Sequence, residues 1–561
     1  MSRFNTRGHA AKPAVATAVS PMGTTSQKAP DTRTFEGGAG WTKDAKTNLF
    51  LRTSASFNDG GNKFYESGYE RDEKLRALAR QVAVEDFTWF AQFVKWLRRT
   101  ANIRTSAIMV AADGVKARLD AGEQGAVGAT VPDPRTWNTD AYFVPTNRSV
   151  IDSVLYRADE PGEMLAYWMA QYGRRVPKPV KRGVADAATR LYTERAVLKY
   201  DTASHRVRFG DVLNIAHATP SPDKMWQGDL FQYALDRRYA SESDIPESLR
   251  MVRANRDLHV ADDVAQWLDP AVLSAAGATW ESALSAVGGR VDKRKLWEAM
   301  IPSMGYMALL MNLRNFDEAG ISNKTANEII VKLVREDEVA KSRQLPFRFL
   351  SAYKNAPSLR WGHALETALD LATTNIPALP GRTLILTDTS ESMMSMVSEK
   401  STVRCLEAAG LFASALALRN AGSVDMYQYA DRTAQIVVPK GGSALRMTAA
   451  ILGHANQVGW GTDIAGSVRN TYRQHDRVVI LSDGQGVNYG TTKASSVAAS
   501  VPPHVPVYLF NIEGYSASPM PTGTAARFDL GGLSDQTFKL IPLLEQGVSG
   551  DSLWPWEINS S

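Results

Sequence analysis

The chain has 561 residues, of which 44% are hydrophobic and 22% are charged, and it contains one cysteine. This composition excludes a chain that is disordered throughout, and the length exceeds what one hydrophobic core supports, so several domains are expected. The single cysteine, Cys405, excludes an internal disulfide and a cysteine-rich zinc site, which fits a reducing cytoplasm. We therefore expect a cytoplasmic multidomain protein.

The formal net charge of +5 is unevenly distributed. Residues 1–380 contain 51 Lys and Arg against 44 Asp and Glu, whereas residues 381–561 contain 13 against 15. A polyanion is the natural partner of a basic surface. The excess is modest, so it favours such a partner for the first part of the chain without identifying it.

Residues 1–35 are rich in Ala, Ser, Thr, Gly and Pro and contain no apolar run of the length that a secretory signal has. We expect them to form a flexible tail. No stretch of the chain reaches the roughly 18 apolar residues of a membrane span, so no membrane association is expected.

Residues 64–375 show an almost wholly helical pattern, and we expect a helical domain over 36–376. Apolar residues recur at the i, i+3, i+4, i+7 spacing of one helix face in two sets: Phe90, Phe93, Val94 and Leu97, and Met304, Met307, Ala308 and Met311. Helix starts are predicted at Asp86, Pro161 and Asp292, and helix ends at Gly173, Gly288 and Gly320. Many short helices favour stacked helix pairs, with an irregular helical array as the alternative because no repeat of fixed period is visible.

The pattern changes after residues 375–381, where two prolines and a glycine predict a domain boundary. Strands are expected at 383–387, 424–429, 478–481 and 507–512, with helices near 406–418, 444–455 and 463–474 between them. Strands that alternate with helices predict an α/β domain over 377–561 with a mostly parallel, doubly wound sheet.

Three polar clusters follow strands or precede a helix in this second part: Asp388–Ser392, Gly459–Asp463 and Ser482–Gly484. In an open α/β sheet, ligands bind beyond the carboxyl ends of the strands, so the clusters are expected to meet. An Asp-x-Ser-x-Ser turn directs one carboxylate and two hydroxyls into the same space. Carboxylate, hydroxyl and water oxygens suit a hard cation such as Mg²⁺, whereas zinc prefers His or Cys.

The pattern resembles the metal-ion-dependent adhesion site of von Willebrand factor A domains. The resemblance implies one divalent cation, Mg²⁺ or else Mn²⁺ or Ca²⁺, with Asp388, Ser390 and Ser392 as direct ligands. Thr462 would bind directly or through water, and Asp483 through water. Such sites leave one coordination position for a partner's carboxylate. A Ser/Thr/Asp turn alone is more often a helix N-cap, and the alternative for each cluster is that role.

Residues 174–208 are strongly basic, with ten Lys and Arg against three acids. Such a segment can neutralise phosphates, although a charge run is often only a solvated face. The aromatic residues Trp89, Trp96, Trp168 and Tyr172 could stack on bases, but their helical spacing favours a role in the core.

Several stretches of the helical region resemble the Ro (TROVE-domain) family, in bacterial or phage-type form: 184–188, 198–200, 211–217, 307–315 and 345–352. The order of helical region and A-type domain is also that of the family, and the resemblance covers about 36–561. The glycine- and tyrosine-rich signature of the family's N-terminal module is only loosely represented, by 37–41 and 58–65.

The resemblance implies HEAT-like helix pairs that close into a ring within one chain, so a monomer is expected. Y-like small noncoding RNA would bind the outer surface, single-stranded 3′ ends of misfolded RNA would enter the ring, and a 3′-to-5′ exoribonuclease such as polynucleotide phosphorylase would be a partner. The implied roles are RNA quality control and stress response. The candidate RNA-contacting residues are Lys178, Lys181, Arg182, Lys199, Arg206 and His217.

No phosphate-binding loop, zinc-protease helix or nucleophile elbow is present in the sequence. We therefore expect no catalytic residues and no enzyme. Two alternatives stay open at this point. One is a metal-dependent protein-docking adaptor that does not bind RNA; the other is a nuclease that uses Asp388 and Asp483 with a metal to activate water.

Overall fold

The protein is described by a computed structural model, which covers most of the two predicted regions. The structure describes residues 32–33, 39–42, 44–55, 68–123, 145–239, 244–344, 346–356, 358–374, 376–397, 401–485, 497–513, 517–520 and 526–531, and the single positions 538, 541, 542, 545, 554 and 556. Two of these residues, Thr32 and Arg33, fall in the predicted N-terminal tail and form a short strand, and residues 1–31 and 34–35 lie outside the described part.

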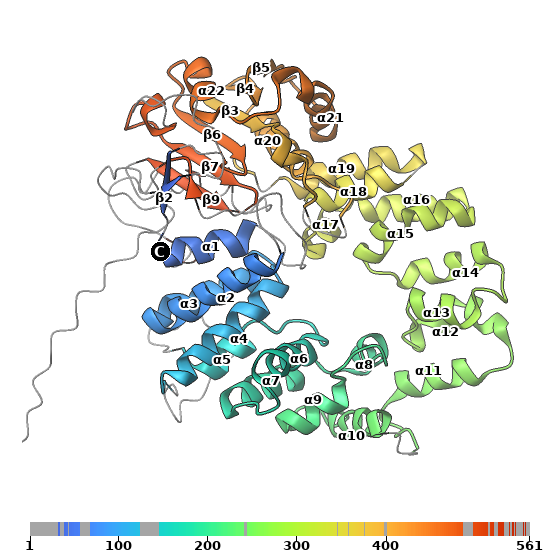
Figure 1. Ribbon diagram of the computed structural model, residues 1–561. Helices are drawn as coiled ribbons and strands as arrows, with labels where there is room; N and C mark the ends of the chain where they lie inside the picture. The colour runs from blue at the N-terminus through green and yellow to red at the C-terminus, as the bar shows by residue number, and fades with distance from the viewer. Residues whose placement is uncertain are drawn as a thin grey trace, which may run out of the picture.

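Helices make up the region from Ala45 to Ala372 and follow one another round a ring (Figure 1). Their bounds are α1 Ala45–Ala55, α2 Gly68–Glu85, α3 Phe87–Arg99, α4 Thr105–Asp120, α5 Asn147–Asp152, α6 Glu160–Tyr172, α7 Lys178–Leu191, α8 Glu194–Tyr200, α9 Phe209–Ala216, α10 Gln227–Tyr239, α11 Arg250–Val260, η2 Val264–Leu268, α12 Pro270–Ala275, α13 Trp280–Val287, α14 Lys293–Met300, η3 Ile301–Ser303, α15 Tyr306–Ala319, α16 Asn323–Leu333, α17 Glu336–Ser342, α18 Pro346–Asn355, η4 Leu359–Trp361 and α19 Gly362–Ala372. The expected helical ring is therefore confirmed.

The helix limits follow local sequence signals, and all six predicted starts and ends are confirmed. Asp86 caps α3 by accepting a hydrogen bond from the Trp89 N–H at 3.0 Å, which satisfies one free donor of the first turn. Gly320 ends α15 in the left-handed conformation, with φ of 66°, which costs glycine little. The remaining predicted limits are Pro161 of α6, Asp292 of α14, and the terminal Gly173 and Gly288.

One predicted apolar face is correct and the other is wrong. The four residues predicted on α3 are fully buried. On α15 the buried face consists instead of Tyr306, Leu309, Leu310 and Leu313, and Met311 is 67% exposed. The methionine set has the same spacing but its register is shifted, and Met304 lies before the helix begins.

The helical ring is closed by contacts between its beginning and its end. The Asn102 amide, after α3, donates to the Arg343 carbonyl at 3.3 Å. The Arg343 guanidinium donates to the Arg99 and Thr100 carbonyls, the latter at 3.2 Å. These residues are more than 240 positions apart, so the ring closes within one chain.

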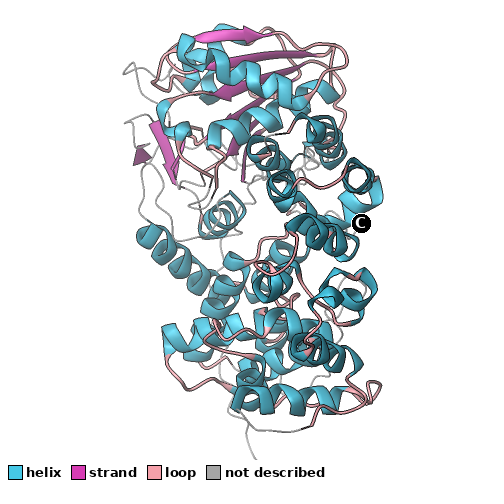
Figure 2. Cartoon of the chain, turned by 90° about the vertical axis from the view of Figure 1, so that its right-hand side faces the viewer, coloured by secondary structure: helices cyan, strands magenta, loops and turns pink. Residues whose placement is uncertain are grey.

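A six-stranded sheet follows the helical ring (Figures 1 and 2). Its strand order is β5-β4-β3-β6-β7-β9, with parallel pairing except between β4 and β5. The strand bounds are β3 Thr383–Asp388, β4 Val424–Tyr429, β5 Thr433–Ile436, β6 Arg477–Ser482, β7 Val507–Asn511 and β9 Arg527–Gly531, and the helices are η5 Glu391–Met394, α20 Cys405–Arg419, α21 Ala444–His454, η6 Ala455–Val458, α22 Ile464–Thr471 and η8 Val497–Ser500. The doubly wound α/β fold is confirmed, whereas β5 and β9 were not predicted.

The two faces of the sheet are covered by different helices because successive side chains of a strand point to opposite faces. Ile385 of β3 belongs to the same apolar cluster as α20 and α21. Its neighbours Leu384 and Leu386 belong to a second cluster with α22. Both faces are buried, which explains the near-continuous apolar sequences of β3 and β6.

The apolar core does not divide at the predicted domain boundary. One cluster joins α1–α10, the first part of α11 and Trp554, while another runs from Leu258 of α11 through α19 into one face of the sheet. The change from helices to strands falls between Ala372 and Thr383, close to the predicted limit. The assignment of 36–376 and 377–561 as separate domains stays a prediction.

Residues near the two ends of the described chain contact each other at two places. Strand β2 (Ala39–Thr42) pairs with β1 (Thr32–Arg33) and with β8 (Ala517–Ser518) in a small antiparallel sheet. The indole rings of Trp554 and Trp556 stack with centroids 5.5 Å apart and pack on an aromatic cluster of α1 and α3. That cluster consists of Phe50, Trp89, Phe93 and Trp96. None of the described helices combines the length and apolar character that a bilayer crossing requires.

Candidate functional site

The three predicted polar clusters meet at the carboxyl ends of the central strands. Asp388 ends β3, and Ser482 ends the adjacent parallel strand β6, with Asp483 directly after it. The Glu391 N–H donates to the Trp460 carbonyl at 3.0 Å, which holds the loop before α22 against the turn after β3. Asp388, Ser390, Ser392, Thr462 and Asp483 are all at most 3% exposed. The structure therefore brings the predicted clusters together.

Asp388 is the most extensively hydrogen-bonded member of the site. Its Oδ1 accepts from the Ser390 N–H at 2.9 Å, and its Oδ2 accepts from the Ser482 hydroxyl and from the Tyr429 hydroxyl at 3.2 Å. The sequence placed Ser482 in one of the polar clusters but predicted no contact between it and Asp388, and Tyr429 was not predicted in the site at all. Both end strands that neighbour β3, so only the strand register shows that they face Asp388.

The site holds two buried carboxyl groups, and burial opposes their ionisation. Burial raises the pKa of Asp388, against the effect of its hydrogen bonds from Ser390, Ser482 and Tyr429. The pKa of Asp483 is raised to about 8, first by burial and then by repulsion from the Asp388 carboxylate. A cation placed between the two carboxylates would reverse both effects.

The donor set fits a hard divalent cation. The Ser390 and Ser392 hydroxyl oxygens lie 3.3 Å apart, and Asp483 Oδ2 is buried without a hydrogen-bond partner in the described part of the chain. A buried carboxylate oxygen without a donor is costly, and a metal or its water shell would satisfy it. The described residues contain no group of three His, Cys, Asp or Glu placed to hold a metal, so the hydroxyls are needed to complete this set.

The basic segment 174–208 covers helices α7 and α8 and the loops on either side of them. Lys178, Lys181 and Arg182 occupy the first turns of α7, and His217 follows α9, which packs against α7. Lys178, Arg182 and His217 are exposed, and Lys181 is partly exposed.

Lys199 and Arg206 occupy separate cavities, so the six predicted RNA-contacting residues do not form one compact site. Lys199 of α8 lines a cavity of about 250 Å³ with Met307 and Met311 of α15. Arg206, before α9, lines a smaller cavity of about 60 Å³ against α6. Both side chains are exposed, and the Lys199 ammonium also lies 5.1 Å from the Tyr200 ring centroid.

Most cations of this segment have no acidic partner within the described residues. Of the ten Lys and Arg in 174–208, only two form ion pairs: Arg190 with Asp152 at 2.6 Å, and Arg208 with Asp201 at 2.6 Å. The other eight are Arg174, Arg175, Lys178, Lys181, Arg182, Arg195, Lys199 and Arg206. The two ion-paired arginines join neighbouring elements, and the other eight cations are exposed or partly exposed and form no ion pair with any residue that the structure describes.

The four aromatic residues weighed as base-stacking candidates belong to the core, as favoured by their spacing. Trp89 and Trp168 are 5% and 1% exposed, and Trp96 and Tyr172 are half-buried against the same core. The Tyr172 hydroxyl also donates to the buried Asp113 carboxylate.

Comparison with known proteins supports the same reading of the fold. The TROVE domain family matches residues 275–360, from the end of α12 to η4. Telomerase protein component 1 from Mus musculus and that from Rattus norvegicus are each 39% identical to this chain over 83 residues. That match covers 14% of this chain and 3% of each relative, so the chain spans only a small part of their length.

The crystal structure of the Deinococcus radiodurans RO (RSR) protein superimposes with a TM-score of 0.59, over 88% of this chain and 99% of that one, at 16% sequence identity. The chain therefore has the fold of this Ro protein, and residues 275–360 match the TROVE domain family. The structural match extends through the helical ring and into the sheet, so the predicted order of a helical region followed by an α/β region is confirmed.

Proposed function

We propose that this protein is a non-catalytic, cytoplasmic RNA-binding ring that acts as a monomer. It would bind Y-like small noncoding RNA on its surface and single-stranded 3′ ends of misfolded or decaying RNA, and so act in RNA quality control and stress response. The observation that carries the proposal is the set of eight exposed or partly exposed cations in 174–208 that form no ion pair with a described residue.

Physical chemistry favours a polyanion for this surface. A cation without an acidic partner can contact a phosphate without first breaking an ion pair within the protein. Each such contact also releases a counterion from the nucleic acid. A protein that neutralises about six phosphates loses roughly 10³-fold in affinity between 50 and 200 mM salt. Exposed Lys and Arg at the start of α7 therefore support binding with a steep salt dependence and no sequence preference of their own.

The test is filter binding of the full chain to a structured RNA with a single-stranded 3′ tail. Reversal of three charges, Lys181→Glu, Arg182→Glu and Lys199→Glu, is expected to lower affinity at least tenfold and to flatten the salt dependence. A control with the same change in net charge reverses Arg294, Arg314 and Lys341, which are exposed and paired within their own helices. Equal losses in both variants would contradict a local binding surface.

We further propose that the cluster at the sheet edge binds one divalent cation, Mg²⁺ in preference to Mn²⁺ or Ca²⁺. Asp388, Ser390 and Ser392 would hold it directly, with Thr462 and Asp483 direct or through water. The bound cation would supply an electrophilic position for an acidic group of a protein partner. A 3′-to-5′ exoribonuclease such as polynucleotide phosphorylase is the proposed class of partner.

Two alternatives remain distinct in their tests. An adaptor that docks proteins through the metal without binding RNA would show no difference between the two charge-reversal variants. A nuclease would degrade the tailed RNA in Mg²⁺ and lose this activity on Asp388→Ala. Two carboxylates combined with serine and threonine hydroxyls suit ligand docking at a single metal better than two-metal hydrolysis, which supports the non-catalytic proposal.

A further inference from the structure

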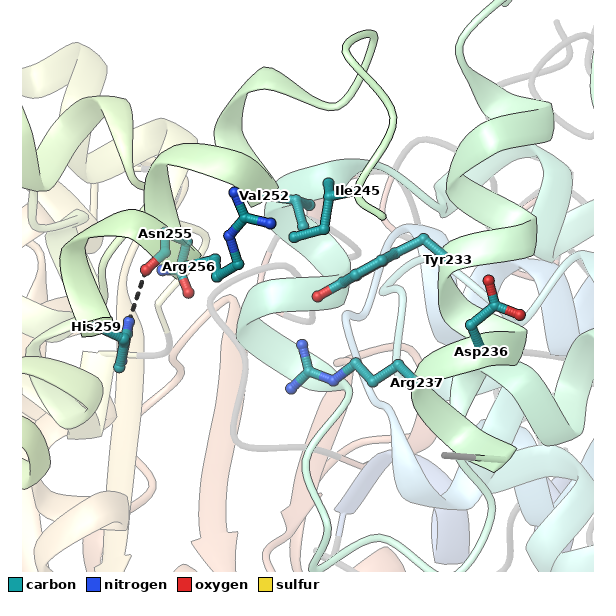
Figure 3. A pocket seen from close by; sticks show the side chains of 8 residues that line it. All are labelled: Tyr233, Asp236, Arg237, Ile245, Val252, Asn255, Arg256 and His259. Atoms are coloured by element: carbon teal, nitrogen blue, oxygen red, sulfur yellow. Dashed lines mark hydrogen bonds between the residues drawn. The ribbon is translucent and has the colours of Figure 1, made fainter. Parts of the chain in front are cut away.

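A cavity of about 510 Å³ lies between α10 and α11, apart from both sites described above (Figure 3). Its volume falls within the roughly 300–1,000 Å³ of small-molecule sites in proteins. Tyr233 and Arg237 of α10 and Asn255 and Arg256 of α11 line it. No residue of the basic segment 174–208 contributes to its lining, so it is a separate feature of the ring.

The cavity lining holds two guanidiniums, those of Arg237 and Arg256, and one carboxylate, that of Asp236, whose Oδ1 accepts a hydrogen bond from the Gln232 amide at 2.8 Å. Arg237 Nε lies 3.4 Å from Asp201 Oδ2, but the same carboxylate already pairs with Arg208 at 2.6 Å. One negative charge therefore serves two guanidiniums. Arg256 pairs with its neighbour Asp257 at 3.0 Å, with both side chains about half exposed or more, and such a pair contributes little in water.

The remaining walls combine an aromatic ring with aliphatic side chains. In Figure 3 the Tyr233 hydroxyl points into the cavity, and the guanidiniums of Arg237 and Arg256 extend toward it from the two helices. The Tyr233 hydroxyl has no hydrogen-bond partner among the described residues. Ile245 and Val252 add an apolar wall, so a planar ring and an anion can be accommodated side by side.

Asn255 supplies an oriented acceptor on the second helix. Its amide nitrogen donates to the Ala276 carbonyl at 2.9 Å, which fixes the side chain and leaves its carbonyl oxygen as an acceptor. The His259 ring, held by a 2.8 Å hydrogen bond to the Asn255 backbone carbonyl, closes the same end of the cavity (Figure 3). Fixed polar groups beside a stacking surface are typical of sites that recognise one orientation of a ligand.

We propose that this cavity binds a single nucleotide, with its phosphate between Arg237 and Arg256 and its base against the Tyr233 ring. Guanidiniums suit phosphate because their planar N–H groups match its oxygens, and base stacking on an aromatic ring contributes about 1–3 kcal/mol. The choice of a ribonucleotide rests on the proposed RNA-binding function. The nucleotide is either free or one unit of a bound RNA strand.

Equilibrium dialysis of the full chain against labelled AMP tests the proposal. Saturable binding is expected, with adenosine and inorganic phosphate each at least tenfold weaker because each lacks one of the two recognised parts. Equal affinity for AMP and inorganic phosphate would overturn the assignment of a base-binding wall. Absence of AMP binding would overturn the proposal as a whole.

Two variants and one matched control locate the binding. Arg256→Gln removes an exposed guanidinium, and Tyr233→Leu removes the ring but keeps an apolar side chain, so both are expected to fold and to bind AMP at least tenfold more weakly. Arg250→Gln on α11 removes an exposed arginine that does not line the cavity, and it should bind AMP as the unmodified protein does. Equal affinity of all variants would place AMP elsewhere and refute the site.

Competition by an unstructured oligoadenylate separates the two sources of nucleotide. Displacement of AMP by the oligomer, with the oligomer also weakened by Arg256→Gln, indicates that the cavity holds one unit of an RNA strand. AMP binding without competition indicates a free nucleotide. The outcome is independent of the charge-reversal test on α7, because that variant should still bind AMP even if the proposed RNA binding fails.

Discussion

The helical ring and the sheet edge place their charged groups in opposite environments. The cations of the ring's basic segment stand in solvent, and eight of ten have no acidic partner in the described structure. The carboxylates of the sheet edge, Asp388 and Asp483, are fully buried beside hydroxyl groups. The first arrangement suits a polyelectrolyte whose binding is governed by salt, and the second suits one small cation whose binding is governed by geometry and pH.

The comparison predicts that the two sites can be inactivated separately, and the metal site should give the largest effect. Asp388→Ala removes the central carboxylate and is expected to lower Mn²⁺ affinity more than 100-fold in titration calorimetry, with RNA affinity unchanged within twofold. Asp425→Asn is the matched control, because Asp425 lies near the other end of the neighbouring strand β4. Unchanged Mn²⁺ affinity in Asp388→Ala would refute the metal site.

The pH dependence should also separate the two regions. The pKa of Asp483 is raised to about 8 without metal, so below that pH a cation must displace a proton. We expect apparent Mn²⁺ affinity to fall by up to about tenfold per unit as the pH drops from 8 to 6, and to level off above 8. RNA affinity should change much less, because Lys and Arg keep their charge over this range. A flat metal profile would contradict the coupling of this carboxyl group to the metal.

The smallest expected effect concerns His217, which ends α9 in the left-handed conformation with φ of 55°. Asparagine tolerates this conformation well, so His217→Asn removes the imidazole with little change in stability. If the ring contacts RNA, filter binding should show a two- to tenfold loss, the equivalent of about one hydrogen bond. Unchanged RNA affinity, with an unchanged unfolding temperature, would show that His217 does not contact RNA and that its role is to end α9.

Much of the fold could be predicted because its signals are local. Strands β3 and β6 are buried on both faces, so their sequences are continuous apolar runs of the expected length. Strand β9 escaped prediction because Arg527 and Asp529, at 3% and 0% exposed, interrupt its apolar pattern. The buried Arg527 guanidinium donates to backbone carbonyls, including that of Val505 at 2.7 Å. A local sequence pattern does not predict hydrogen-bond partners so far along the chain.

In the candidate metal site too, some residues could be predicted from local sequence and others depend on long-range contacts. Asp388 and Asp483 were predictable because each directly follows or ends a buried strand. The contacts of Tyr429 and Ser482 with Asp388 were not, because they depend on which strands pair and in which register. The methionine face of α15 was placed wrongly for a related reason. Two sets of apolar residues, shifted by two positions, satisfy the same helical period, and only packing against neighbouring helices selects between them.

Trp554 and Trp556 pack on α1 and α3, so the apolar surface of these first helices is covered only when the C-terminal residues are present. Trp554 is 4% exposed and packs against Phe50 and Trp89, which lie more than 460 positions earlier in the chain. A shortened protein that lacks the last ten residues would expose that surface, and a contiguous apolar surface of this kind promotes self-association. Affinity tags and truncations are therefore better placed before Thr32 than at the carboxyl end. A small deletion at the carboxyl end would remove the two tryptophans that pack on α1 and α3.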